Sequence, residues 1–306
     1  MTGTTSKGLL SGLIYSVVSA VCFGMMAIIA KLGFAAGLSG AHMLQYRFTF
    51  ASAMLALVLA AKDPRLFRIS RSSLLKCLGL GSVGYASQSM LFMQTLGYLP
   101  ASTTELILYS YPVVVTLLSV LIFRLPLTRS IGAALVLVSL GAALVFHDAF
   151  SKHLDPVGLI YAVAVVAVFS AYLLCVQAVL KGEKPLRMTF YVVLSAALTY
   201  NLVNGPAAFL DMTPTRLGLG LILGLVPTTV AASCLYLAIE RIGSAYTSIF
   251  CSLEPVATLV AAHLLLGEEV AALQLAGVVL IVAGIVLPNL RLLFQRHLAA
   301  PAPERP

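Results

Sequence analysis

Long apolar runs separated by short polar turns follow one another along almost the whole chain. The runs are about 20 residues long, and a helix of that length crosses a ~30 Å hydrocarbon core. Turn-forming pairs such as Asp63-Pro64, Asp155-Pro156 and Thr213-Pro214 stand between them. We therefore predict ten membrane-spanning helices. Their bounds are 9–30, 41–61, 73–96, 102–123, 129–147, 156–180, 187–210, 216–238, 244–266 and 270–290.

The composition agrees with this pattern. Hydrophobic residues make up 60% of the chain, charged residues 10%, and the mean hydropathy is +1.02. A soluble domain carries about 25% charged residues. A membrane β-barrel alternates apolar and polar positions in segments of about 10 residues, and no such alternation is present. The predicted fold class is an all-α integral membrane protein.

The second half of the sequence resembles the first. Tyr111-Pro112-Val113 aligns with Glu254-Pro255-Val256, 143 residues later. The ten spans divide into two sets of five, residues 9–147 and 156–290, followed by a cytoplasmic tail at 291–306. Five is odd, so two similar halves must cross the membrane in opposite directions. Inverted repeats of this kind are typical of transporters that alternate access to a central site.

The positive charges indicate how the chain is oriented. With the spans placed as above, 15 of the 19 Lys and Arg residues fall on the side that holds both termini. The positive-inside rule then places both termini in the cytoplasm. The net charge of +8 is therefore a topology signal. Binding of nucleic acid is disfavoured, because the charges are scattered over short loops without interleaved aromatic residues.

Ionisable residues inside the predicted spans are the candidates for function, because burying them in lipid is costly. On an ideal helix Glu105 and Tyr109 share one face, and the equivalent span places Cys251 and Glu254 together. Two such stripes could line a cavity. A structural alternative is an internal ion pair of Glu105 with Arg47 or Lys31. Lys31 could also reach the outer interface without a partner.

The predicted substrate cavity and the predicted hinge take their residues from several spans. Gln177 is the repeat equivalent of Lys31, and Asn201 lies within the seventh span. Pro255 beside Glu254 could form a proton-sensitive hinge, although a purely structural kink is equally compatible. The candidate cavity residues are Lys31, Arg47, Tyr85, Gln88, Glu105, Tyr109, Tyr111, Gln177 and Asn201, and the candidate coupling or hinge residues are Glu254, Pro255 and Pro112.

Other chemistries have little support in the sequence. The five cysteines lie in or near apolar spans without paired spacing, so we predict neither disulfides nor a metal site. No phosphate-binding glycine loop or nucleotide-hydrolysis motif occurs, and no cofactor is expected. Transport would then depend on a gradient.

An intramembrane enzyme is disfavoured, because Glu105, Glu254 and His263 fall at different depths and on different helix faces. A non-transporting scaffold would gain nothing from buried charge.

One segment resembles a known family. Ser252-Leu253-Glu254-Pro255-Val256, followed by Gly267-Glu268-Glu269 and Gly277, is similar to the second-repeat signature of EamA-type carriers in the drug/metabolite transporter superfamily. Phe23-Gly24, Arg47-Phe48 and Pro112 agree with the first repeat. The resemblance implies ten spans in two inverted EamA repeats, a bacterial inner-membrane location and export of small polar metabolites such as amino acids.

Several properties stay open at this stage. The alternative substrates are organic anions and phosphorylated or nucleotide-linked metabolites. The expected partners are a small-molecule substrate and membrane lipid, and the protein is either a monomer or a homodimer.

Overall fold

The structure is a computed structural model, and it describes residues 6–99, 101–147, 154–210, 212–266 and 269–298. All regular secondary structure in these residues is helical. The predicted tail is partly helix, because α14 continues to Leu298, and residues 299–306 lie outside the described part. The helices of the first half of the chain are α1 (Ser6–Ala35), α2 (Gly40–Lys62), η1 (Pro64–Phe67), α3 (Arg71–Gly79), η2 (Leu80–Ala86), α4 (Ser87–Tyr98), α5 (Ala101–Leu108), α6 (Tyr111–Phe123) and α7 (Arg129–Val145).

The second half repeats much of this order. Its helices are α8 (Pro156–Leu180), α9 (Pro185–Asn204), α10 (Ala207–Leu210), α11 (Pro214–Gly224), η4 (Leu225–Val230), α12 (Ala231–Cys251), α13 (Glu254–Leu266) and α14 (Ala272–Leu298). Polar residues cap several starts, as where Asp155 accepts hydrogen bonds from the backbone N–H groups of Val157 and Gly158. The seventh predicted span was placed too far, because its helix α9 ends before Gly205 (φ +64°).

Within the described residues, six helices are long and apolar enough to cross a membrane. They are Gly8–Ala35, Gly40–Lys62, Thr103–Phe123, Pro156–Leu180, Pro185–Asn204 and Pro214–Cys251. Arg129–Val145, Glu254–Leu265 and Ala272–Val286 are shorter apolar helices. The predicted span 73–96 is not a single α-helix. The protein is therefore a multi-pass helical membrane protein in which some predicted spans are shortened or interrupted.

Two interruptions are π-helical and occupy matching places in the two halves. η2 separates α3 from α4, and η4 separates α11 from α12. A π segment inserts an extra residue into the helical turn and is frequent at functional sites. Gly81 lies in η2, and Gly224, 143 residues later, directly precedes η4. A Cβ at Gly81 would lie 2.3 Å from the Val192 carbonyl oxygen of α9.

The other interruptions are breaks in the middle of predicted spans. The chain turns at 109–110 between α5 and α6, and at 252–253 between α12 and α13. Pro112 and Pro255 lie in the first turn of the helix that follows each break, where a missing N–H costs nothing. A further break occurs inside α12 at Gly243, whose φ of 78° and ψ of 164° are accessible to glycine.

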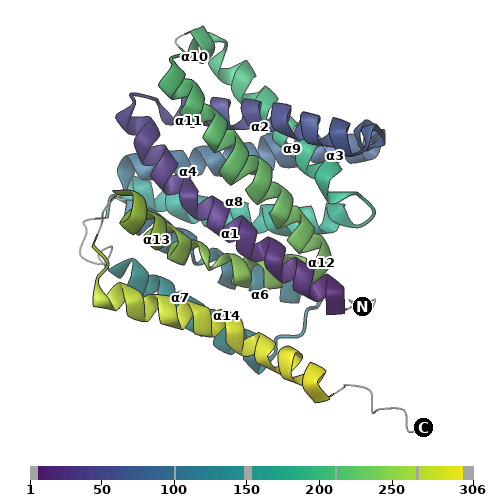
Figure 1. Cartoon of the computed structure of the whole chain (residues 1–306), viewed down its shortest axis with the longest axis vertical. Helices are drawn as coiled ribbons and strands as arrows, with labels where there is room; N and C mark the ends of the chain where they lie inside the picture. Colours follow the sequence, from purple (N-terminus) through teal and green to yellow (C-terminus); the bar gives the residue numbers. More distant parts are fainter. Residues whose placement is uncertain (1–5, 100, 148–153, 211, 267–268, 299–306) are drawn as a thin grey trace.

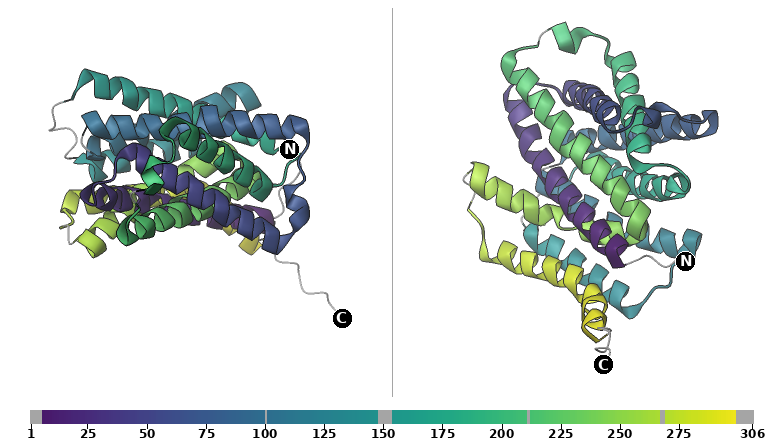
Figure 2. Two further views of the ribbon diagram at one scale, coloured as in Figure 1. Left: turned by 90° about the horizontal axis from the view of Figure 1, so that it is seen from above. Right: turned by 45° about the vertical axis from the view of Figure 1, so that its right-hand side comes forward.

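Helices from the two halves pack directly against each other. α1 lies along α12 and α13, while α8 lies along α4 and α6. α2 packs on α9, and α7 and α14 run side by side at one end of the molecule in both Figure 1 and Figure 2. At that last crossing a Cβ on Gly141 would lie 2.7 Å from the Gly277 carbonyl oxygen. Glycine is required there because the backbones almost touch.

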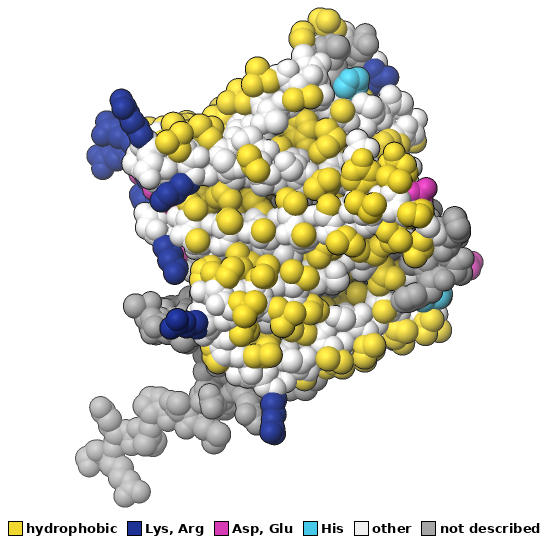
Figure 3. Space-filling model, turned by 180° about the vertical axis from the view of Figure 1, so that it is seen from behind, with side chains coloured by type: hydrophobic (Ala, Val, Ile, Leu, Met, Phe, Trp, Pro, Cys, Tyr) yellow, Lys and Arg dark blue, Asp and Glu magenta, His cyan; other side chains and the backbone are white. Residues whose placement is uncertain are grey.

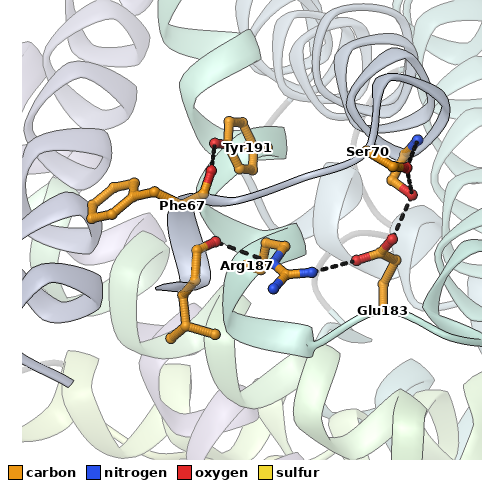
Figure 4. A network of polar contacts seen from close by, with 7 residues as sticks. Phe67, Ser70, Glu183, Arg187 and Tyr191 are labelled. Carbon is orange, nitrogen blue, oxygen red and sulfur yellow. Dashed lines mark hydrogen bonds and ion pairs between the residues drawn. The ribbon is translucent and has the colours of Figure 1, made fainter. Parts of the chain in front are cut away.

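A polar network ties the segment after α2 to the start of α9 (Figure 4). Arg187 donates from Nε to the Leu66 carbonyl oxygen at 3.1 Å and forms an ion pair with Glu183 at 3.3 Å. Glu183 also accepts a hydrogen bond from Ser73, and the Tyr191 hydroxyl donates to the Phe67 carbonyl oxygen at 2.7 Å. The network therefore links the first half to the second outside the apolar helix contacts.

Arg187→Ala is expected to lower the free energy of unfolding by about 1 kcal/mol, because the Leu66 carbonyl group loses its donor. The ion pair contributes little to this, since both side chains are partly exposed. Thermal unfolding of the purified protein in detergent measures the change, with the exposed Lys184→Ala as control. An unchanged melting temperature for Arg187→Ala would show that water replaces the bond without loss.

Candidate functional site

A cavity lies between the two halves of the chain. It has about 60 Å³ open to the centres of water molecules, enough for bound water. Helices of both halves contribute to its wall. The lining residues are Phe23, Met26, Arg47, Tyr85, Gln88, Ser89, Phe92, Glu105, Leu108 and Tyr111 from the first half, and Phe169, Tyr172, Ala232, Leu235 and Glu254 from the second.

Arg47 is the cation among the described residues that line this cavity, and it is 3% exposed. Its Nε donates to Thr228 Oγ1 at 2.7 Å, and one terminal nitrogen donates to the Tyr85 hydroxyl at 2.9 Å and to the Pro227 carbonyl oxygen at 3.2 Å. The other terminal nitrogen lies 3.3 Å from the Met26 sulfur. All of these partners are neutral, so the guanidinium is held in place while its charge stays uncompensated by direct hydrogen bonding.

The rings around Arg47 add weaker attraction. The guanidinium carbon lies 5.1 Å from the Phe48 ring centre and 5.5 Å from the Tyr85 ring centre. These are cation–π distances. Thr228 and Pro227 belong to η4, so a π segment of the second half positions a side chain of the first half.

Two carboxyl groups share the cavity with Arg47. Glu105 lies on α5 and is 8% exposed, and its Oε2 atom has no hydrogen-bond partner among the described residues. Glu254 is the first residue of α13, directly after the break at 252–253. The proposed ion pair between Glu105 and Arg47 is not formed, because every hydrogen bond of Arg47 goes to a neutral group.

Aromatic side chains form much of the remaining wall. Tyr85 stacks on Tyr172 with ring centres 5.5 Å apart, and Tyr111 meets Phe169 edge to face at 4.9 Å. The hydroxyl groups of Tyr172 and Tyr236 are 2.5 Å apart and bond each other. The cavity therefore combines a largely aromatic surface with one arginine and two glutamate side chains.

The comparisons with known proteins match the chain twice to one family. A model of the EamA-like transporter family covers residues 10–147 and again residues 156–290. The chain belongs to the EamA-like transporter family. Membership makes it a membrane transporter of the drug/metabolite type, and the family consists of transporters and not of enzymes.

The fold of this EamA-like chain also occurs among solved structures. Matches extend to 29 chains. One, titled "Crystal structure of protein", aligns with a TM-score of 0.76 over 96% of this chain and 99% of that chain, at 16% identity. At that identity the likeness shows the fold alone. No curated protein matches the sequence.

Six of the residues singled out from the sequence line the cavity of the EamA-like chain. These are Arg47, Tyr85, Gln88, Glu105, Tyr111 and Glu254. The stripe expected from an unbroken helix is not present, because α5 ends at Leu108. Tyr109 follows α5, is not among the residues that line the cavity, and stacks on Phe146 with ring centres 5.7 Å apart. Its hydroxyl group has no partner among the described residues.

Two other candidate residues, Gln177 and Asn201, lie outside the cavity. Gln177 accepts a hydrogen bond from the backbone N–H of Ser244 and so supports the break at Gly243. Asn201 accepts from Gln45 at 3.1 Å and donates to Thr49 at 2.8 Å, which joins α9 to α2. Both replace the expected cavity contact with a helix–helix contact. The side chain of Lys31 lies outside the described part of the structure.

Sequence reasoning missed several groups in the site of this EamA-like protein. Thr228 and the Pro227 carbonyl hold Arg47, and Phe169 and Tyr172 form the aromatic wall. The run Pro227-Thr228-Thr229 inside an otherwise apolar span was a usable signal. Phe169 and Tyr172 had none, since aromatic residues in a span are usually packing. Among the described residues no group of three or more His, Cys, Asp or Glu side chains could hold a metal ion.

Proposed function

We propose that this protein is a gradient-driven secondary transporter that exports a small polar metabolite such as an amino acid. The observation that carries the proposal is the cavity between the two matched repeats, with Arg47, Glu105 and Glu254 in its wall. Repeat-built transporters bind substrate near the bilayer midplane, where the repeats meet. Burying these ionisable side chains in a membrane costs free energy, and binding of a polar solute is a function that explains their presence.

The wall chemistry favours a solute with both polar and apolar parts. A guanidinium with an unpaired charge attracts a carboxylate, which it can hold with two parallel hydrogen bonds. Glu105 and Glu254 can accept from an amino group, and the aromatic wall suits an apolar side chain. The alternative is an organic anion or a phosphorylated metabolite, which Arg47 favours. Two carboxyl groups in the same cavity argue against a solute with several negative charges.

Equivalent glycine contacts in the two halves support an inverted arrangement of two five-span repeats, residues 9–147 and 156–290. Gly81 of the first repeat meets the carbonyl oxygen of Val192 and the Ser195 side chain on α9. Gly224 of the second repeat meets Phe50 and lies near the Arg47 carbonyl oxygen on α2. The same crossing is thus made twice with the roles of the repeats exchanged. Such exchange is expected of two halves related by a pseudo-two-fold axis.

The charge distribution supports the proposed orientation, and the bacterial inner membrane is the location that the family resemblance implies. Lys and Arg side chains gather along one edge of the face shown in Figure 3, and the broad surface between the edges is hydrophobic. α1 begins and α14 ends at that same edge (Figure 1). The positive-inside rule makes this the cytoplasmic side. Lipid is then the partner of the apolar surface, with the protein acting as a monomer or homodimer.

The breaks between helices are points at which the protein could bend and so open the cavity to one side of the membrane or the other. The turns at 109–110 and 252–253 lie beside Tyr111 and Glu254, two residues of the cavity wall. A rotation about either turn would move the wall without unwinding a complete helix. Pro112 and Pro255 preserve these turns, since neither residue can donate the hydrogen bond that would close the helix.

Counterflow in proteoliposomes tests the proposal. Vesicles loaded with one unlabelled amino acid at high concentration should accumulate the same labelled amino acid from outside, and a panel of amino acids should show selectivity. Protein-free vesicles serve as the control. The absence of counterflow for all amino acids and for organic anions would contradict the proposed function.

A further inference from the structure

The charges in the cavity do not balance if every group is ionised. Arg47 is the one cation among the described side chains that line it, while Glu105 and Glu254 supply two carboxyl groups. Three ionised groups would leave a net negative charge inside an aromatic and aliphatic wall. Isolated charge in such surroundings is strongly disfavoured, and the group responds by taking up a proton.

The surroundings of the two carboxyl groups also disfavour the ionisation of both. Glu105 and Glu254 line the same cavity as Arg47, so two ionised carboxylates would repel each other there while Arg47 would attract them. Glu105 Oε2 is buried with no hydrogen-bond partner, a costly position for an ionised carboxylate oxygen. Two carboxyl groups that share one site cannot both ionise readily.

Among the side chains that the structure describes, no other titratable group near the pair supplies a second positive charge. The groups facing it from the packed helices are phenols and a thiol, which are neutral when they hold their protons. These groups are Tyr85 on η2, Tyr109 in the turn after α5, Tyr111 on α6, Tyr172 on α8 and Cys251 on α12.

We propose that Glu105 and Glu254 act as a one-proton pair that keeps the cavity neutral, so that coupled proton movement follows the charge of the solute. This rests on the proposed transport function. A solute with net positive charge replaces the proton, which leaves to water on the open side. A zwitterion binds with the proton retained. A net anion binds only with a second proton on the pair, and charge in the cavity is conserved in each case.

Infrared spectroscopy of the purified protein at neutral pH tests the pair without any substrate. The wild-type protein should show the C=O stretch of one buried protonated carboxyl group. Glu105→Gln and Glu254→Gln should each remove the band, because the remaining carboxylate then balances Arg47. Arg47→Gln should roughly double it, because both carboxyl groups are then neutral. The exposed Glu240→Gln is the control and should leave the band unchanged.

A wild-type spectrum without the band would overturn the proposal, and so would a single Glu variant that keeps it. A variant that fails to fold is recognised by its thermal unfolding profile, and the other Glu variant then decides.

In a second experiment, vesicles with an internal pH dye and the membrane potential clamped are given lysine, leucine or glutamate. Lysine uptake should release protons from the vesicle, leucine uptake should move none, and glutamate uptake should acidify the interior. Equal proton movement for all three transported solutes contradicts charge-following coupling, whereas no flux at all contradicts only the transport function.

Discussion

Arg47→Ala is expected to reduce counterflow by roughly 30-fold or more while the protein still inserts and folds. The loss corresponds to about 2 kcal/mol, the lower end of what a buried charge-assisted contact contributes. The guanidinium is the one described cation in the wall, and its hydrogen bonds to Thr228, Tyr85 and Pro227 aim it into the cavity. Counterflow in proteoliposomes of matched protein content measures the effect.

Two further variants separate charge from position. Arg47→Lys keeps the charge but loses the planar fork, so an intermediate flux is expected. Thr228→Val removes the acceptor of Arg47 Nε, together with the hydrogen bond that the Thr228 hydroxyl donates to the Leu223 carbonyl oxygen, and should have a smaller effect on flux than Arg47→Ala. Wild-type flux in Arg47→Ala, with an unchanged melting temperature, would assign Arg47 to packing only.

Gly81→Ala is expected to destabilise the protein by about 2 kcal/mol or more, within the range of overpacked cores. Its Cβ would stand 2.3 Å from the Val192 carbonyl oxygen and 2.5 Å from the Ser195 Cβ. One of these neighbours is backbone, so η2 and α9 must move apart for the methyl group to fit. Thermal or denaturant unfolding in detergent measures the loss.

Gly79 provides a matched control two residues away. A Cβ there meets nothing within 4 Å, and its φ of −61° and ψ of −46° are helical. Gly79→Ala should leave stability unchanged or raise it by about 1 kcal/mol. Gly224→Ala, with its nearest contact at 2.9 Å, should fall between the two. Equal stability of Gly81→Ala and Gly79→Ala would show that the crossing adjusts without cost.

Helix placement was largely predictable because it depends on local composition. The predicted span 156–180 coincides with α8, and the start predicted at 129 coincides with that of α7. Apolar length and turn residues act over a few neighbours, so they are visible in the chain itself. The π segments were not predicted, because Leu80–Ala86 and Leu225–Val230 lie inside the apolar runs 73–96 and 216–238.

The candidate site was partly predictable. Arg47, Glu105 and Glu254 are conspicuous because ionisable residues are rare in apolar spans. Tyr109 was misplaced because an ideal helical stripe was extended across a break. Gln177 and Asn201 were misplaced because their partners Ser244 and Gln45 are far away in the sequence.

The sequence by itself determined that this protein is a multi-pass helical membrane protein made of two related halves with a few buried charges. Those properties depend on the transfer of each segment from water to lipid, which is a sum over neighbouring residues. Only the tertiary structure decided which charges share a cavity and which polar groups hold Arg47. Contacts such as Arg47 with Thr228 depend on how α2 crosses η4, and glycine contacts between distant segments determine that crossing.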